Sequence, residues 1–183
     1  LFPDTTYGME SGGDPEVIPE LTYEDYLSFH QKYYHPSNSY IYLYGDMNVE
    51  EKLVFMDEQY LSQFEEITVD SEIGIQEAFT KVKELKEEYP VSEEEEGENQ
   101  TFLSYNVQVG SCLDRKLYLA FQMLEYVLLA SPAAPLKKAL IEAGIGEDIM
   151  SSYDNGILQP VFSVIAKNAE EAQKDEFLTI IRE

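Results

Sequence analysis

The hydrophobic positions between residues 22 and 64 change their period twice. A helical stripe follows Thr22, an N-cap residue type, and Pro36 ends the pattern. The β-branched and aromatic run SYIYLYGD over 39–46 predicts a strand, and Asn48, with Glu51 at the capping-box position, predicts a second helix. The stripes expected to face inward are Tyr23, Tyr26, Leu27, His30, Tyr33 and Tyr34 in the first helix, and Val49, Leu53, Met56, Tyr60 and Phe64 in the second.

Residues 65–100 follow neither period. They contain the charge run EEYPVSEEEEGENQ, which predicts an irregular, solvated acidic loop. Glu93–Glu96 raise a calcium site as an alternative, but the spaced Asp or Asn ligands and the glycine of a calcium-binding loop are missing. We therefore expect a loop here.

A clear alternation returns in TFLSYNVQVG, which predicts a strand with one wet face over 101–110. The set expected to be buried is Leu103, Tyr105, Val107 and Val109. The set expected to be wetter is Ser104, Asn106 and Gln108.

The next segment, 114–130, is apolar almost all round and predicts a central helix. Ser131 and Pro132 have the residue types of an N-cap and a first helical residue, so they predict the start of another helix. That helix is expected to stop at Gly144.

Two strands and a helix are expected in the last 40 or so residues. The strands flank a turn at Asp154-Asn155-Gly156, and Asn168 is expected to cap the final helix, with Glu171 three residues on. The inner stripe of that helix is predicted to be Ala169, Ala172, Phe177, Ile180 and Ile181.

The order of these elements predicts an α+β fold. A two-layer arrangement, with helices packed on a mostly antiparallel four-stranded sheet, accommodates it. Residues 1–20, with three prolines and three glycines, are interpreted as a connector, and residues 21–183 as a single domain that contains the 65–100 loop. We expect a piece of a longer protein, because the chain opens without Met and stops inside a helical pattern.

Charge and cysteine content narrow the possible partners. A net charge of −24 disfavours nucleic acid and anionic membranes, both of which need a basic face. A cationic partner or a merely solvated acidic surface both remain open. Cys112 is the only cysteine, which excludes an intrachain disulfide and favours a cytoplasmic location. No apolar run approaches the ~18 residues of a membrane span.

Catalytic chemistry is hard to find in the residues themselves. His30 and His35 are five residues apart, which places the rings about 140° apart on a helix, and no acid lies between them. Cys112 has no Cys-x-x-Cys partner and no identifiable base, so a structural thiol is favoured over a nucleophile. We therefore predict no catalytic and no metal-binding residue, and the substrate-binding residues are unknown.

An ordered set of short motifs carries a resemblance to a known family. Three later segments continue the resemblance more loosely: EYPVSEEEE, SPAAPLKKALIEAGIGED and GILQPVFSVIAKN. The run at 131–136 departs from the usual Ser-Ser-Pro-Leu of that family. The motifs that carry it most closely are Phe2-Pro3, Ser11 to Pro15, Ile18-Pro19, Leu21 to Tyr23, Phe29-His30, Tyr33 to Asn38 and Tyr44 to Asp46. On these motifs the chain resembles the presequence-protease-like branch (subfamily C) of the insulinase-type (M16) zinc metallopeptidases.

The resemblance implies a parent of four homologous α+β domains, with the LuxS- and mitochondrial-processing-peptidase-like metallohydrolase fold, forming a two-halved chamber. This chain is similar to the second domain of the first half. The family's zinc site lies in an upstream domain, as an inverted His-x-x-Glu-His helix and a distal Glu. The resemblance thus implies zinc in the full-length parent and no cofactor in this chain.

The implied partners are the upstream catalytic domain and the C-terminal half of the same polypeptide, with short unfolded peptides as the parent's substrates. The implied function is a non-catalytic, chamber-forming domain of a zinc metalloendopeptidase. The alternative is a structural or peptide-binding domain of an inactive M16-like parent, so whether the parent is an enzyme stays uncertain. Residues 1–20 would then carry the chain from the catalytic domain into the helix that begins after Thr22, as a packed connector rather than a flexible linker.

Overall fold

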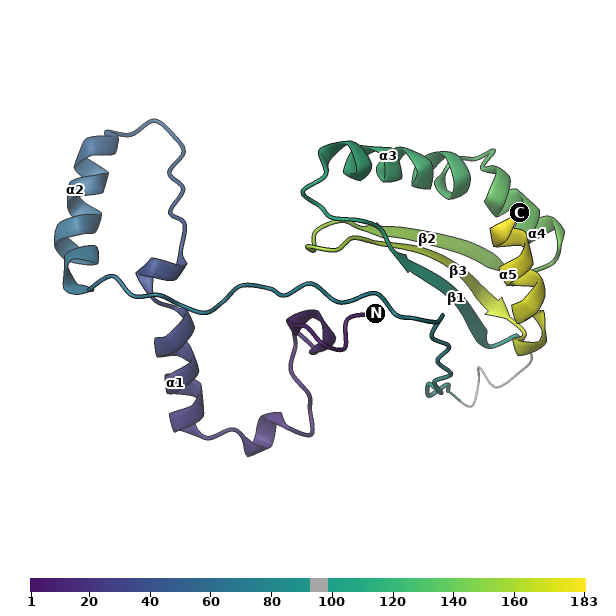
Figure 1. The fold of residues 1–183 in the computed structure, drawn as a ribbon, viewed down its shortest axis with the longest axis horizontal. Helices are drawn as coiled ribbons and strands as arrows, with labels where there is room; N and C mark the ends of the chain where they lie inside the picture. Colours follow the sequence, from purple (N-terminus) through teal and green to yellow (C-terminus); the bar gives the residue numbers. More distant parts are fainter. Residues whose placement is uncertain (93–98) are drawn as a thin grey trace. The chain divides into compact units, whose positions relative to one another are not determined.

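A computed structural model describes residues 1–92 and 99–183, so the Glu93–Glu96 run and its calcium alternative lie outside the described residues. The chain forms two compact units (Figure 1). We call Leu1–Thr5 with Ile75–Glu183 the sheet unit, and Thr6–Gly74 the helix-pair unit. The assignment of 21–183 to a single domain stays a prediction.

An antiparallel sheet of three strands forms the centre of the sheet unit. Strands β1 (Thr101–Gln108), β2 (Asp148–Asp154) and β3 (Val161–Ala169) lie in the order β1-β3-β2. The central strand pairs on both sides, because Ser163 of β3 lies opposite Asn106 of β1 and opposite Ser152 of β2. The predicted hairpin around residues 154–156 is confirmed, since β2 and β3 flank it.

Helices cover one face of this sheet (Figure 1). They are α3 (Arg115–Glu125), a π-helical turn η5 (Tyr126–Ala130), α4 (Pro135–Glu142) and α5 (Lys174–Arg182). The Asp114 carboxylate starts α3 by accepting hydrogen bonds from the Lys116 and Leu117 N–H groups at 3.0 and 3.1 Å. Gly144, at φ 71°, follows the end of α4, as the sequence predicts.

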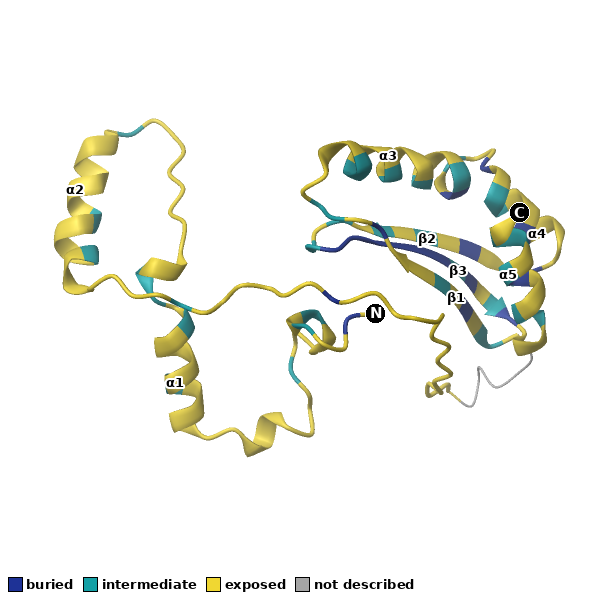
Figure 2. Cartoon of the chain, in the orientation of Figure 1, coloured by how far each residue is buried: buried dark blue, intermediate teal, exposed yellow. Residues whose placement is uncertain are grey.

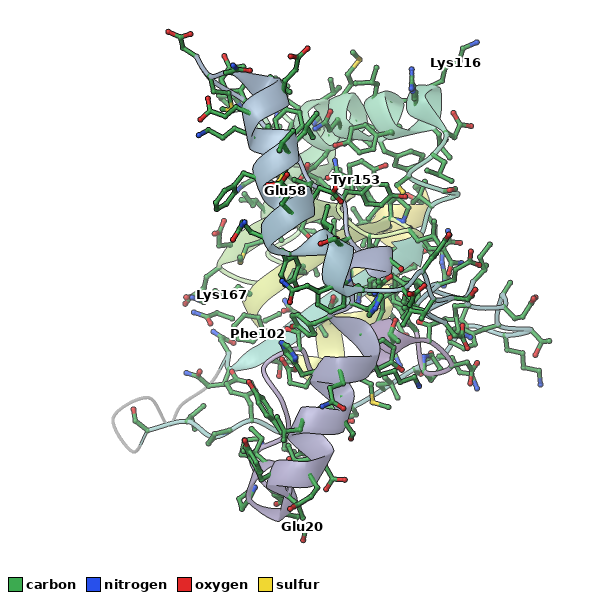
Figure 3. All side chains as sticks on the ribbon, turned by 90° about the vertical axis from the view of Figure 1, so that its left-hand side faces the viewer. Glu20, Glu58, Phe102, Lys116, Tyr153 and Lys167 are labelled. Atoms are coloured by element: carbon green, nitrogen blue, oxygen red, sulfur yellow. The ribbon has the colours of Figure 1, made fainter. Side chains whose placement is uncertain are left out.

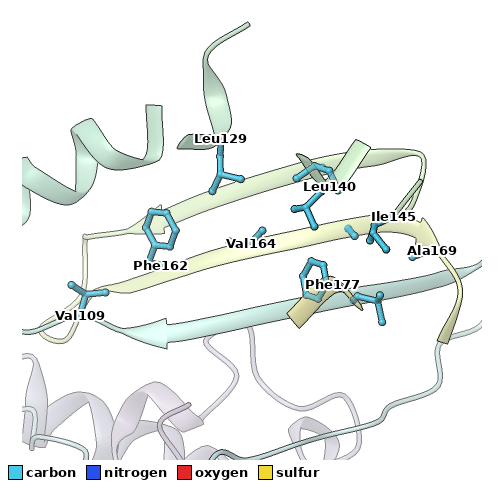
Figure 4. Close-up of a cluster of buried hydrophobic side chains, with 11 residues drawn as sticks. Val109, Leu129, Leu140, Ile145, Phe162, Val164, Ala169 and Phe177 are labelled. Atoms are coloured by element: carbon cyan, nitrogen blue, oxygen red, sulfur yellow. The ribbon is translucent and has the colours of Figure 1, made fainter. Parts of the chain in front are cut away.

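The core lies between this helical layer and the sheet (Figure 4). Leu140 and Ile145 are fully buried, and Phe177 of α5 is 1% exposed. Burial of a side chain of this size contributes roughly 1.5–3 kcal/mol. Glu20, Glu58, Lys116 and Lys167 are exposed, and the side chains of Lys116 and Lys167 extend outward from the ribbon (Figure 3). The buried apolar cluster is Leu103, Val109, Leu129, Leu140, Ile145, Ile149, Phe162, Val164, Ala166, Ala169 and Phe177.

The helix-pair unit contains α1 (Tyr23–Tyr33) and α2 (Val49–Gln59), with 3₁₀ turns before and after them. Both predicted caps are confirmed. The Thr22 hydroxyl accepts the Asp25 N–H at 3.1 Å while the Asp25 carboxylate accepts the Thr22 N–H at 3.2 Å, and Asn48 caps α2. Hydrogen bonds from the Thr22 hydroxyl and N–H lower the pKa of Asp25. Nevertheless neither helix has a buried residue (Figure 2).

The sequence predicts a four-stranded sheet, but one of the four predicted strands does not form. Residues 39–46 have no ladder partner, so they form no strand. Tyr42 and Tyr44 are 85% and 86% exposed, whereas Leu43 is 38% exposed, so the alternation of the sequence survives without a sheet. The reason is physical: period-2 patterning favours a strand, but only hydrogen bonds to a neighbour complete one.

The predicted burial of three helices also needs correction. Tyr23 and Tyr26 of α1 are about two-thirds exposed, at 70% and 67%, and Leu53 of α2 is 53% exposed. The segment 114–130 is not central, because Met123 and Val127 are 66% and 54% exposed. Only its inner side contacts the core, through Leu117, Phe121, Leu128 and Leu129.

Two helix starts are displaced from their predicted residues. The fourth α-helix begins at Pro135 rather than at Pro132, because Ser131 closes a turn by accepting the Ala134 N–H. Asn168 belongs to β3 with φ 54° and donates to Glu147, so it caps no helix. Glu170 takes that role in a capping box ahead of the 3₁₀ turn that leads into α5.

One helical stretch among the described residues, Arg115–Glu142, is long and apolar enough to cross a membrane by length and composition alone. The sequence pattern predicts no such stretch. Residues 131–134 interrupt it between η5 and α4, and the core helix of a soluble protein passes the same criterion. The finding is therefore weak evidence for a membrane span.

Candidate functional site

The sheet face opposite the helices carries three cross-strand rows. The ladder register defines them as Ser104–Ile165–Met150, Asn106–Ser163–Ser152 and Gln108–Val161–Asp154. In each row the β1 and β2 side chains are more exposed than the β3 side chain, which is at least half-buried. We call these nine residues the open sheet face.

The open sheet face has the polarity that the alternation in β1 predicts. Ser104, Asn106 and Gln108 are exposed, and Asn106 Nδ2 donates to Ser104 Oγ at 2.8 Å. On the opposite side of β1, Leu103 is buried, Tyr105 packs against the core, and Val109 beyond the strand end is buried. Val107 departs from the predicted burial with 38% exposure. The prediction of one buried and one wetter face is otherwise confirmed.

The chemistry of the open sheet face is hydrogen bonding rather than proton transfer. Its polar groups are amides and hydroxyls, with Asp154 as its one carboxylate. Hydroxyls and amides can both donate and accept, so they can bind a peptide backbone without reacting with it.

The two histidines do not form a metal site. The His30 ring stacks on Tyr34 with centroids 4.7 Å apart, and the His35 ring contacts the edge of Phe64 at 5.3 Å. His35 Nδ1 accepts the Ser37 N–H at 3.2 Å, so that nitrogen is engaged in capping a turn. Within residues 1–92 and 99–183, no group of three or more His, Cys, Asp or Glu side chains could hold a metal ion. In the part of the chain that the structure describes, the residues therefore do not fit zinc.

Cys112 is half-buried just beyond the end of β1. Its N–H donates to the Leu158 carbonyl at 3.0 Å, which fixes the backbone there. The titratable group that the thiol influences is Tyr153, whose pKa is raised by burial first and then by Tyr118 and Cys112.

The helix-pair unit contains an aromatic hollow of about 460 Å³. Sequence reasoning finds the tyrosines and the turn after α1 but not this hollow, because its walls come from two separate stretches of the chain, 29–41 and 60–61. The ring of Tyr33 also carries Lys32, whose Nζ lies 4.8 Å from the ring centroid. The main lining side chains are Phe29, Tyr33, Tyr34, Pro36, Ile41 and Tyr60.

Comparison with known proteins decides the family. A family model described as the Peptidase M16 inactive domain matches residues 20–183. The chain belongs to the M16 peptidase family. The predicted membership is thus confirmed, and the matched M16 region is one that the family model calls inactive.

Three M16 relatives show which branch the chain resembles. It is 46% identical over 181 residues to Protein HypA of Clostridium perfringens, covering 99% of this chain and 19% of that protein. It is 38% identical to Presequence protease 1, chloroplastic/mitochondrial, of Arabidopsis thaliana, covering 93% and 16%. It is 35% identical to the mitochondrial presequence protease of Mus musculus, covering 90% and 16%. The chain therefore spans less than a fifth of the length of these relatives.

Proposed function

We propose that this chain is a non-catalytic, chamber-forming domain of a longer M16 zinc metalloendopeptidase that degrades short unfolded peptides. The observation that carries the proposal is the match of residues 20–183 to the inactive M16 domain. The presequence-protease relatives, of which the matched region is 16%, support the placement within a larger polypeptide. An upstream catalytic domain and a C-terminal half of the same chain would complete the enzyme.

The open sheet face is the part of the domain that we assign to the chamber wall. Its exposed amides and hydroxyls can hydrogen-bond any extended backbone, which suits a substrate class defined by being unfolded rather than by sequence. Zinc would be held elsewhere in the parent, since the histidines and Cys112 of this chain do not converge. The proposed location is the cytoplasm.

The test compares the 183-residue chain with the full-length parent on the same unfolded peptides. We expect the parent to cleave them and to lose activity with a chelator, while the chain alone binds no zinc and cleaves nothing. Stoichiometric zinc in the purified chain, lost on His30→Ala substitution, would overturn the assignment. A full-length parent with no activity and no His-x-x-Glu-His helix would instead favour the structural or peptide-binding alternative.

The strong negative charge suggests which unfolded peptides the parent prefers. A net charge of −24 attracts cationic peptides, and this attraction is screened beyond about 8 Å at physiological salt. We expect a modest kcat/KM preference of the parent for a basic over a neutral peptide of equal length, and we expect the preference to fall as salt is raised. A preference that does not respond to salt would mean that the acidic composition serves only solubility.

A further inference from the structure

The chain passes between its two units twice. It leaves the sheet unit after Thr5 and returns to it at Ile75. The residues beside these crossings are buried within the sheet unit, with Phe2 and Gln76 each 8% exposed. If the two connecting segments were flexible linkers, they would not bury a side chain beside each crossing.

The Gln159 side chain holds the returning segment. Its Oε1 accepts the Gln76 N–H at 2.7 Å, and its Nε2 donates to the Gln76 carbonyl at 3.1 Å. One side-chain amide thus supplies both hydrogen bonds that a paired strand residue would supply. Gln159 is 7% exposed, so water does not replace these bonds easily, and each is costly to leave unmade.

The Gln76 side chain in turn binds the departing segment at Asp4. Its Oε1 accepts the Asp4 N–H at 2.9 Å, and its Nε2 donates to Asp4 Oδ2 at 2.7 Å. The orientation of both amides follows from these partners, because turning either one would oppose donor to donor and acceptor to acceptor. Residues 4, 76 and 159 are therefore joined in one order despite sequence separations of 72 and 83.

Gln159 itself sits on a fixed piece of backbone. The Pro160 carbonyl accepts the Val109 N–H at 2.8 Å, and the Leu158 carbonyl accepts the Cys112 N–H at 3.0 Å. Pro160 is among the fully buried residues. The amide therefore projects from a loop that is anchored on both sides to the end of β1.

We propose that Gln159 and Gln76 form an amide clasp that ties the exit and the return of residues 6–74 to each other and to the β2–β3 loop. Within the sheet unit, the segment that leaves after Thr5 and the segment that returns at Ile75 are then held together instead of being two independent linkers. Both glutamines are positioning residues, with no part in bond cleavage. The clasp is independent of the proposed peptidase function.

The test is hydrogen exchange, resolved by NMR, in the 183-residue chain carrying Gln159→Glu. A carboxylate keeps the shape and the acceptor but lacks the donor for the Gln76 carbonyl. We expect the amide protons of Asp4 and Gln76 to exchange at least about tenfold faster together, while those of Val164 and Ala166 of β3 keep their rates. Gln122→Glu, the same change at an exposed position of α3, is the matched control and should alter none of these rates.

A second variant separates the two links of the clasp. Asp4→Ala removes the carboxylate that Gln76 Nε2 contacts, so residues 2–5 should exchange faster while the Gln76 N–H, held by Gln159, keeps its rate. Faster exchange at only one crossing in Gln159→Glu, or at neither, would overturn the proposal. Acceleration of β3 by the same factor would also overturn it, because Gln159 would then support the whole sheet unit.

Discussion

Three helices of equal length lie in two different surroundings. Helices α1 and α2 of the helix-pair unit and α3 of the sheet unit each have 11 residues, and each begins at a side-chain cap. Only α3 has a sheet beneath it, and only its segment reaches a core, through residues such as Leu117 and Phe121. The comparison separates two requirements: caps and propensity start a helix locally, whereas burial depends on a second layer.

The same contrast holds for extended segments. Residues 39–45 and β1 both lack charged side chains, and both are rich in β-branched and aromatic residues. β1 pairs with β3 from Thr101 to Gln108, while residues 39–46 pair with no strand of the sheet. A β pattern is therefore a necessary but not a sufficient signal, because the partner strand is a non-local choice.

Hydrogen exchange gives the largest expected difference between the two units. Amides of β3, bonded on both sides, should exchange only through global unfolding, whereas those of Tyr40–Tyr44 should exchange almost freely. For a stability of at least about 5 kcal/mol this predicts a ratio of about 10³ or more in protection. Equal protection in the two segments would break the comparison and restore the predicted fourth strand.

Truncation of a core side chain in the sheet unit should lower the free energy of unfolding by several kcal/mol more than truncation of an exposed side chain in the helix-pair unit. Phe177→Ala removes a ring that is 1% exposed and leaves a cavity, so the free energy of unfolding should fall by about 3–5 kcal/mol. The control Tyr26→Ala, at a position 67% exposed on α1, should change it by less than about 0.5 kcal/mol. Urea denaturation of both variants measures this. A large loss in the control would show that α1 is buried against a partner in solution.

Removal of a helix cap should lower the free energy of unfolding by a smaller amount, and only when the cap lies in the sheet unit. Asp114→Ala deletes the acceptor for two N–H groups of α3 and should lower the free energy of unfolding by about 0.5–2 kcal/mol. Thr22→Ala deletes the capping box of α1, which should reduce helical circular dichroism without moving the main urea transition. A shift of that transition by Thr22→Ala as large as that by Asp114→Ala would mean that α1 unfolds together with the core.

The helix starts show how far local patterns predict this fold. The caps at Thr22 and Asn48 are predicted correctly because a cap is decided by residues within one turn. The cap predicted at Asn168 is wrong because β3 continues through that residue, and Glu170 forms the capping box with Gln173 instead. Sequence spacing alone does not choose between two adjacent caps.

The exposure of the α1 face and the presence of the amide clasp could not be predicted from sequence patterns, for a different reason. The apolar stripe of α1 predicts an inner face, but whether a layer covers it depends on residues far along the chain. Gln76 and Gln159 give no local signal at all, since their partners are 72 and 83 residues away. The open face of β1 was predictable because alternation in a strand already specifies two faces.

The smallest expected effect concerns two exposed ion pairs of the sheet unit. Lys174 Nζ lies 2.8 Å from Glu84, and Lys86 Nζ lies 2.7 Å from Glu171. The hydrogen bond from Lys174 lowers the pKa of Glu84 below its ordinary value of 4.5, and Lys86 lowers that of Glu171 in the same way. Each pair fixes the irregular segment before β1 to the region at the start of α5, but solvent screens the attraction.

The sign of the pH effect follows from these directions. A carboxyl whose pKa is lower in the folded chain stabilises it above the ordinary pKa and loses that contribution as pH falls through the lowered value. Glu84→Gln should therefore reduce stability slightly at neutral pH, and the difference from the parent chain should shrink to nothing as the pH falls below the lowered pKa. Glu87→Gln, the same change at an exposed position of the same segment, is the matched control for the loss of one negative charge. If the Glu84→Gln difference grew as pH fell, the carboxylate would be destabilising in the folded chain, and this ion pair would not hold the segment in place.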